Sequence, residues 1–409
     1  MSGGERTHDR LAIDGGSPVR ADLLPLTRPW MDEEEAQAAA DAVRRSQLIG
    51  GGSIGRAAEQ DLSVWVDGRS PLFLNSCTAA LETAVWLSDV RAGDEVILPS
   101  FTFVSCANAV IRAGGRPVFA DIDPQTLNLD PGSVERAITP RTRAIIVVHY
   151  AGAAADLDAL GALAERHGLR IIEDAAHALG ARSAGRPLGT IGDFGCFSFH
   201  GTKDVVCGEG GALVCRDERD VRRAELFREK GTNRSAFFRG EVDKYTWVEA
   251  GGSLVASDVL AAILRVQIRR LPAVLARKRA LADRLTAALA PIASVVTLPS
   301  PDAHRESSWH LYPMLVPPDV RDLTLRALRA EGIGAAFHYV PLHDSPYAQA
   351  AFGSVPDALP VTTRVSASLV RLPLFAAMTD RDLDDVAAAT CKVVSQVLAG
   401  ERVAPHGAR

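Results

Sequence analysis

Lysine is the charged residue that this chain has least of. Only five lysines occur among its 45 basic residues, so arginine occupies nearly every position where either base would serve. Lys203 is one of the five, and it lies in a short loop of small and apolar residues. Because arginine would serve equally well as a surface charge, a lysine kept at such a place favours a chemical role for its amine.

Other absences exclude whole classes of protein. Six cysteines without a CxxC pair or disulfide-dense spacing predict reduced thiols. No uncharged apolar run approaches membrane-spanning length, and the polar N-terminus lacks the apolar centre of a signal peptide. With 50 acids, 45 bases and a formal charge of -5, no basic surface indicates nucleic acid. We therefore expect a cytoplasmic protein with neither a membrane nor a nucleic-acid partner.

The apolar pattern predicts an α/β fold. From about residue 70, short apolar runs alternate with helical patterns such as 79–87 and 157–167. Near-continuous apolar strands separated by helices are typical of a mostly parallel sheet that is covered on both faces. The expected strands are 72–74, 95–98, 117–121, 144–148, 169–173, 195–199 and 212–215.

A smaller α/β domain is expected after a long, Arg-rich helix over 259–289. Its expected strands are 295–298, 310–316 and 334–339, and its expected helices are 323–331 and 380–398. The predicted division is a large domain over 23–270, a small C-terminal domain over 271–400, and loosely ordered ends over 1–22 and 401–409.

An acid and a lysine carry the strongest chemical signal. Asp174 ends an apolar strand, where an unpaired carboxylate is costly to bury, although capping of the following turn is a simpler role. Lys203 follows 29 residues later, just before the turn Gly208–Gly211. Pyridoxal phosphate (PLP) chemistry requires such a pair. The lysine holds the aldehyde as a Schiff base, and the acid keeps the pyridine nitrogen protonated so that the ring accepts electrons.

Three further places have a functional and a structural interpretation. At a strand-to-helix junction, Thr78 and the backbone of Cys77 suit a phosphate, or else Ser76 or Thr78 simply caps the helix. Phe103 follows a strand end and either stacks on a flat ring or joins the core. His177 either contacts the cofactor or has a structural role.

Two blocks are dense in polar and aromatic residues. Residues 228–247 are typical of a long functional loop. In the second block His338, Tyr339 and His343 follow an expected strand. No carboxylate or cysteine completes a metal set with the two histidines, so we expect no metal and favour substrate contact.

These motifs, in this order, resemble the PLP-dependent nucleotide-sugar aminotransferases of the DegT/StrS group. The residues that carry the resemblance are 173–177, 198–200, Lys203, 208–211 and 338–343, and it runs from about Leu26 to Leu398. Within the group, residues 228–240 and 243–247 look most like enzymes that aminate C4 of dTDP-4-keto-6-deoxyglucose. The resemblance implies the aspartate-aminotransferase-like PLP fold, fold type I, and homodimers with shared active sites.

The resemblance also implies roles for single residues. Lys203 binds the cofactor and later moves the proton to the sugar, Asp174 pairs with the pyridine nitrogen, and His177, where the family uses Gln or His, contacts the ring oxygen. The residues implied to contact the phosphate are Thr78, Ser198, the backbone of Cys77 and Asn233 from the partner subunit. Phe103 is implied to stack on the ring. Many relatives have Gly where Cys77 stands, which a backbone contact tolerates. The residues that the resemblance implies for contact with the sugar nucleotide are His338, Tyr339 and His343.

The implied reaction moves an amino group from glutamate to a dTDP-keto-sugar and yields a 4-amino-4,6-dideoxyhexose. The Arg-rich composition favours an antibiotic sugar over a surface polysaccharide, but the sequence leaves the pathway open. The face of C4 that is protonated stays open. Amination at C3 and a regulator that kept the fold without turnover are the alternatives. Relatives that are sugar 3-dehydratases carry His in place of the lysine, which argues against that reaction. A dehydrogenase lacks support because no GxGxxG opens a helix after an early strand.

Overall fold

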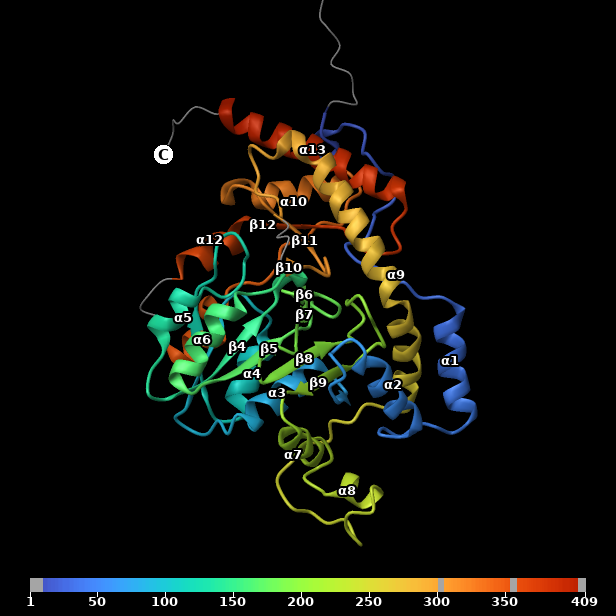
Figure 1. Cartoon of the computed structure of the whole chain (residues 1–409). Coiled ribbons are helices and arrows are strands. Elements are labelled where there is room, and N and C mark those ends of the chain that lie inside the picture. The colour runs from blue at the N-terminus through green and yellow to red at the C-terminus, as the bar shows by residue number, and fades with distance from the viewer. Residues whose placement is uncertain (1–9, 301–304, 354–358, 404–409) are drawn as a thin grey trace, which may run out of the picture.

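A seven-stranded sheet forms the centre of the larger part of the molecule (Figure 1). This computed structural model describes residues 10–300, 305–353 and 359–403. The strand order is β1-β9-β8-β5-β4-β2-β3, and only β9 runs antiparallel to its neighbours. The predicted mostly parallel sheet is therefore confirmed. Its strands are β1 (Pro71–Leu74), β2 (Glu95–Pro99), β3 (Arg116–Ala120), β4 (Thr142–Val148), β5 (Arg170–Asp174), β8 (Phe194–Ser198) and β9 (Gly211–Cys215).

Helices cover this sheet, and two of them match the sequence prediction closely. The expected helix 157–167 is α6, and the expected helix 79–87 begins two residues earlier as α3. The α7–α8 segment projects from the end of the molecule opposite the smaller part (Figure 1). The helices are α1 (Glu33–Arg44), α2 (Ser53–Ser63), α3 (Cys77–Leu87), α4 (Val104–Arg112), α5 (Pro131–Ala137), α6 (Leu157–His167), α7 (Glu218–Arg228) and α8 (Arg234–Phe238).

The smaller part is built on helices and a two-stranded sheet of β11 (Tyr312–Leu315) and β12 (Leu369–Leu372). The prediction of strands over 295–298 and 334–339 is wrong, because each segment makes one isolated bridge, at Thr297 and at Ala336. Short apolar runs do not distinguish a strand from a loop by periodicity alone. The helices are α10 (Arg321–Ala330), α11 (Pro346–Phe352), α12 (Pro360–Ser368) and α13 (Asp380–Val403). A three-stranded sheet joins β10 (Arg305–Glu306) to β6 (Arg182–Ser183) and β7 (Arg186–Pro187).

One helix, α9 (Asp258–Ala288), runs past both parts of the molecule (Figure 1). Leu271 packs in the core beneath the seven-stranded sheet, whereas Leu281 packs in the core shared with α10 and α13. The change from one core to the other therefore falls inside a continuous helix. Of the described part of the chain, no helix is long and apolar enough to span a membrane.

The N-terminal segment is held by the smaller part. Leu11 is buried in its core, and the carboxylate of buried Glu331 accepts hydrogen bonds from Ala12 N at 2.8 Å and Val19 N at 3.0 Å. The prediction of a loosely ordered N-terminus is therefore wrong for 10–22. At the other end, 401–403 continue α13. Residues 1–9 and 404–409, to which the same prediction applied, lie outside the described residues.

A buried carboxylate, Glu173 on β5, fixes the loop beneath the sheet. Its oxygens accept hydrogen bonds from His149 Nε2 at 2.9 Å and from three backbone N–H groups of loop 189–192 at 2.7, 2.7 and 2.5 Å. Burial raises the pKa of Glu173, but these donors outweigh it and the pKa is lowered. Because side chains alternate along a strand, the next residue, Asp174, points to the other side.

We expect Glu173→Ala to lower the free energy of unfolding by about 3–5 kcal/mol, because it leaves several buried donors without an acceptor. Denaturant unfolding followed by circular dichroism measures the loss. Glu173→Gln is the matched control. It keeps the shape and one acceptor oxygen, and its loss should be smaller. An alanine variant within about 1 kcal/mol of the wild type would contradict this role.

Candidate functional site

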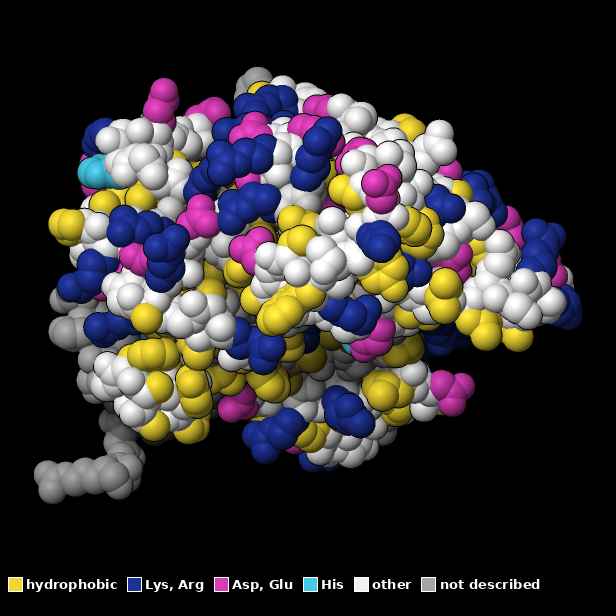
Figure 2. All heavy atoms as spheres, turned by 90° about the horizontal axis from the view of Figure 1, so that it is seen from below, with side chains coloured by type: hydrophobic (Ala, Val, Ile, Leu, Met, Phe, Trp, Pro, Cys, Tyr) yellow, Lys and Arg dark blue, Asp and Glu magenta, His cyan; other side chains and the backbone are white. Residues whose placement is uncertain are grey.

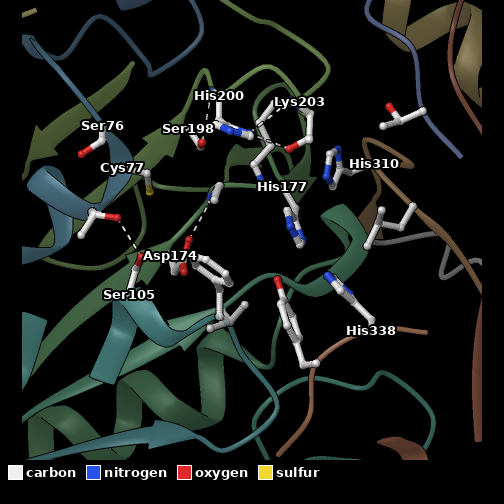
Figure 3. Close-up of a pocket in the computed structure, with 18 of the residues that line it drawn as sticks. Ser76, Cys77, Ser105, Asp174, His177, Ser198, His200, Lys203, His310 and His338 are labelled. Atoms are coloured by element: carbon white, nitrogen blue, oxygen red, sulfur yellow. Dashed lines mark hydrogen bonds between the residues drawn. The ribbon is translucent and has the colours of Figure 1, made fainter. Parts of the chain in front are cut away.

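A cavity of about 500 Å³ lies where the carboxyl ends of the parallel strands face the smaller part (Figure 3). In open α/β sheets this edge is where ligands bind, because the strand ends and helix N-termini converge there. Strand β5 supplies Asp174, and the loop after β8 supplies Lys203. The smaller part closes the opposite wall with His310, His338 and Arg371.

Asp174 is 7 % exposed and is held in place by two donors. Its Oδ1 accepts from Ala176 N at 3.1 Å, and its Oδ2 accepts from Cys106 Sγ at 3.0 Å. Thr102 Oγ1 lies 3.4 Å from the same sulfur. A carboxylate has about four acceptor positions, so these bonds leave Asp174 able to accept another donor from the cavity.

The amine of Lys203 lies in the same cavity as Asp174 (Figure 3). Burial lowers the pKa of Lys203, and the nearby charge of Asp174 only partly offsets it. A lowered pKa increases the share of neutral amine, which is the nucleophilic form.

The N-terminus of α3 forms another wall. Ser76 is the N-cap, and its Oγ accepts from Ala79 N at 3.0 Å, so the capping interpretation applies to Ser76. Thr78 Oγ1 bonds Ser105 Oγ at 2.7 Å. Strand β9 approaches so closely that a Cβ on Gly211 would lie 2.3 Å from Cys77 N. The first N–H groups of a helix lack partners within the helix, so this wall suits an anion.

Four imidazoles line the cavity, those of His177, His310 and His338 and the more exposed one of His200. His177 and His310 stack with ring centroids 4.3 Å apart, and buried His177 Nδ1 has no hydrogen-bond partner among the described residues. His338 Nδ1 bonds Tyr150 OH at 2.9 Å, and its ring stacks on Tyr339 at 3.6 Å. Burial lowers the pKa of His177, His310 and His338, so these three are neutral at pH 7.

The structure brings most of the predicted residues together but not all. Asn233 lies outside the lining of the cavity, at the start of α8, where its Oδ1 accepts from Thr246 N at 2.7 Å. His343 is buried outside the lining, with Nδ1 2.6 Å from Ser100 Oγ. The predicted residues that line the cavity are Cys77, Thr78, Phe103, Asp174, His177, Ser198, Lys203, His338 and Tyr339.

Sequence reasoning missed Cys106, His310 and Arg371. Arg371 donates from Nε and Nη2 to Phe337 O at 3.1 and 2.8 Å, and burial lowers its pKa. It is one of many arginines, so nothing in its neighbourhood marks it out. Cys106 and His310 likewise stand outside any spaced motif. Among the described residues, no group of three or more His, Cys, Asp or Glu side chains could hold a metal ion.

Comparison with known proteins gives consistent matches. A sequence profile described as the DegT/DnrJ/EryC1/StrS aminotransferase family matches residues 29–390. The spore coat polysaccharide biosynthesis protein SpsC of Bacillus subtilis is 35% identical over 385 residues, covering 92% of this chain and 98% of that protein.

Solved structures agree with these sequence matches. The aminotransferase TlmJ from Streptoalloteichus hindustanus matches with a TM-score of 0.84 at 32% identity, over 93% of this chain and 100% of its own. Spr1654 from Streptococcus pneumoniae, a sugar aminotransferase by its description, was solved in a PLP-form. It matches with a TM-score of 0.84 at 27% identity, over 92% of this chain and 99% of its own.

The close approach of β9 to α3 gives a test of the anion-binding wall. We expect Gly211→Ala to weaken PLP binding at least about tenfold, because backbone atoms cannot yield to the new Cβ and the helix N-terminus must move. Fluorescence titration of the apoprotein with PLP measures it. Gly161→Ala, in α6 with open space around it, is the control and should bind PLP as the wild type does. Equal affinity for both variants would contradict the assignment.

Proposed function

The chain belongs to the DegT/DnrJ/EryC1/StrS aminotransferase family, and we propose that it transfers an amino group from L-glutamate to C4 of dTDP-4-keto-6-deoxyglucose. The product would be a dTDP-4-amino-4,6-dideoxyhexose. The chain is an aminotransferase of the PLP-dependent fold type I, as expected from its motifs, and its cofactor is PLP. The observation that carries the assignment is Lys203 and Asp174 in one cavity at the sheet edge.

The cavity fits PLP in three respects. Asp174 keeps acceptor capacity for a pyridinium nitrogen, His177 Nδ1 is a buried atom in need of a partner, and the α3 N-terminus offers N–H groups to a phosphate. We assign the ring nitrogen to Asp174, the ring oxygen to His177 and stacking to Phe103. We assign phosphate binding to Thr78, Ser198 and the backbone of Cys77. When bound, PLP supplies an electron sink and carries the amino group between substrates.

Lys203 has two tasks in this proposal. Its amine would hold the aldehyde carbon of the cofactor in the resting enzyme, and once released it would carry a proton between carbon atoms of cofactor and substrate. Both tasks require a neutral amine for part of the cycle, which the burial of Lys203 favours.

The substrates proposed here are anionic, and the guanidinium of Arg371 is a cation in the cavity that could bind them. Arg371 donates to the backbone carbonyl of Phe337, which carries no charge, so a carboxylate or phosphate entering the cavity would neutralise the guanidinium. His338 and Tyr339 line the same wall and would contact the sugar nucleotide. Support for C4 comes from the resemblance of residues 228–240 and 243–247 to enzymes that act there.

We further propose a cytoplasmic homodimer in which the segment around α8 completes the partner's site. Phe238, Tyr245 and Trp247 on this segment are 69%, 56% and 75% exposed. Figure 2 looks onto the molecule from below, the side where α7 and α8 project in Figure 1, and shows hydrophobic side chains between Lys and Arg. Exposed aromatic residues in such number are typical of a protein interface. Asn233 on this segment would then contact the phosphate in the partner subunit.

The proposed reaction is tested by incubating the holoenzyme with dTDP-4-keto-6-deoxyglucose and glutamate. We expect a dTDP-amino-sugar and 2-oxoglutarate in equal amounts, with the nitrogen on C4. Proton coupling constants in the NMR spectrum of the product identify the carbon and the orientation of the amine. Nitrogen on C3, or no product from this sugar while glutamate still reacts, contradicts the substrate assignment but not the family chemistry.

A second test addresses Lys203. Lys203→Ala should lose the visible absorbance of lysine-bound PLP and reduce turnover by at least about 10³-fold, because the covalent link and the proton carrier vanish together. Lys392→Arg, a change of another of the five lysines, lies in α13 outside the cavity, keeps the charge that pairs with Glu331 and should retain both. An alanine variant at 203 that still turns over would sink the assignment.

A further inference from the structure

His310 is held in place through both its ring and its backbone. It precedes β11, and its Nδ1 lies 3.1 Å from Asp204 Oδ2. Its own backbone N donates to Ala151 O at 3.1 Å. The ring is 7 % exposed, stacks on His177 and faces the cavity that also holds Lys203 (Figure 3).

Asp204 is itself fixed as an anion. Lys278, a buried lysine of α9, forms an ion pair with Asp204 Oδ1 and donates to His310 O at 3.1 Å. Burial raises the pKa of Asp204, but Lys278 and His310 outweigh it and lower the pKa. An ionised carboxylate accepts hydrogen bonds and does not donate them, so Nδ1 of His310 carries the proton. The other ring nitrogen, Nε2, is then the basic one.

We propose that His310 is the proton carrier for the carbonyl oxygen of the substrate. When an amine condenses with a ketone, the carbon–nitrogen bond forms, the carbon–oxygen bond breaks and the oxygen leaves as water. Both protons of that water come from the amine. His310 Nε2 takes each proton from nitrogen and gives it to oxygen, while Asp204 stabilises the transient imidazolium, as a carboxylate does in a catalytic triad.

Other groups in the cavity are less suited to this step. Lys203 is committed to proton transfer between carbons, and His177 faces the cofactor ring in the proposal above. His338 has its Nδ1 bonded to Tyr150 OH, and within the described part of the chain no carboxylate is placed to stabilise its charged form. His200 also lines the cavity, but its side chain is 48% exposed and its Nε2 is 3.7 Å from an exposed carboxylate, Glu209. Of the four imidazoles in the lining, His310 combines a buried ring and a carboxylate hydrogen bond with a ring nitrogen left for the substrate. The inference depends on the aminotransferase reaction and not on which sugar is aminated.

The first test needs neither cofactor nor substrate. In apoprotein labelled with ¹⁵N-histidine, His310 should show a protonated Nδ1 and a bare Nε2 at pH 7, assigned by the signals that His310→Asn removes. Asp204→Asn should alter this pattern. A proton on Nε2 instead, or an imidazolium at neutral pH, overturns the proposal whatever the activity.

The second test isolates the oxygen step. Enzyme loaded with pyridoxamine phosphate is mixed with 2-oxoglutarate carrying ¹⁸O at its ketone, and loss of the label to water is followed by mass spectrometry. His310→Asn keeps an N–H for Asp204 but has no Nε2, and we expect label loss to slow by about 10²-fold or more. Lys203→Ala should still lose the label yet form no glutamate, because it lacks only the later proton transfer.

The controls separate catalysis from structure. His167→Asn, on the exposed surface of α6, should lose the label as the wild type does. His310→Asn should bind PLP with an unchanged spectrum. Label loss at the wild-type rate, or a loss of rate that merely parallels weakened PLP binding, overturns the proposal. If the wild type is inert toward 2-oxoglutarate, glutamate is the wrong donor, and the NMR result still decides for His310. If His310→Asn does not fold, the same measurements apply to His310→Gln.

Discussion

The position of Asp174 is the constraint on which the site depends, and it is set from the opposite side of the sheet. Glu173 accepts four hydrogen bonds beneath β5, and the alternation of side chains along the strand then points the next carboxylate at the cavity. Cys106 and Ala176 N fix its rotation. A buried carboxylate held so firmly cannot turn to solvent, so its charge is stabilised best by a cation inside the cavity.

The opposite wall of the cavity belongs to the smaller part of the molecule, and carboxylates join it to the wall formed by the sheet edge. Asp121, at the end of β3, accepts from Val361 N at 3.1 Å and Thr362 N at 2.8 Å at the start of α12. Asp204 joins the loop of Lys203 to α9 and to the segment before β11. These bonds fix the two walls of the cavity relative to each other. Two bound groups can react only when they are held in a fixed geometry, and the two walls provide it.

The sequence was sufficient for the sheet and for one side of the site. Apolar strand runs and strand-end acids are local signals, so the seven strands, Asp174, Lys203 and the α3 junction were recognisable. The other wall was harder, because its residues meet only through long-range packing. His310 is apart from Asp204 by 106 residues, and Arg371 comes from β12, which pairs with β11 across a long insertion. Asn233 was placed by resemblance alone and His343 by its place in a polar block after an expected strand, and this chain does not direct either at its own cavity.

The electrostatics of the cavity follow from these two walls together. Three imidazoles with lowered pKa values add hydrogen-bonding groups without adding positive charge, and the ion pair of Lys278 with Asp204 is internally neutral. Asp174 is then opposed by Lys203 and Arg371. If the histidines were charged, Lys203 would lose its proton even more readily, but an entering pyridinium would be repelled. Neutral histidines therefore let one buried anion serve the cofactor ring, while the lysine stays reactive and Arg371 stays available to an anionic substrate.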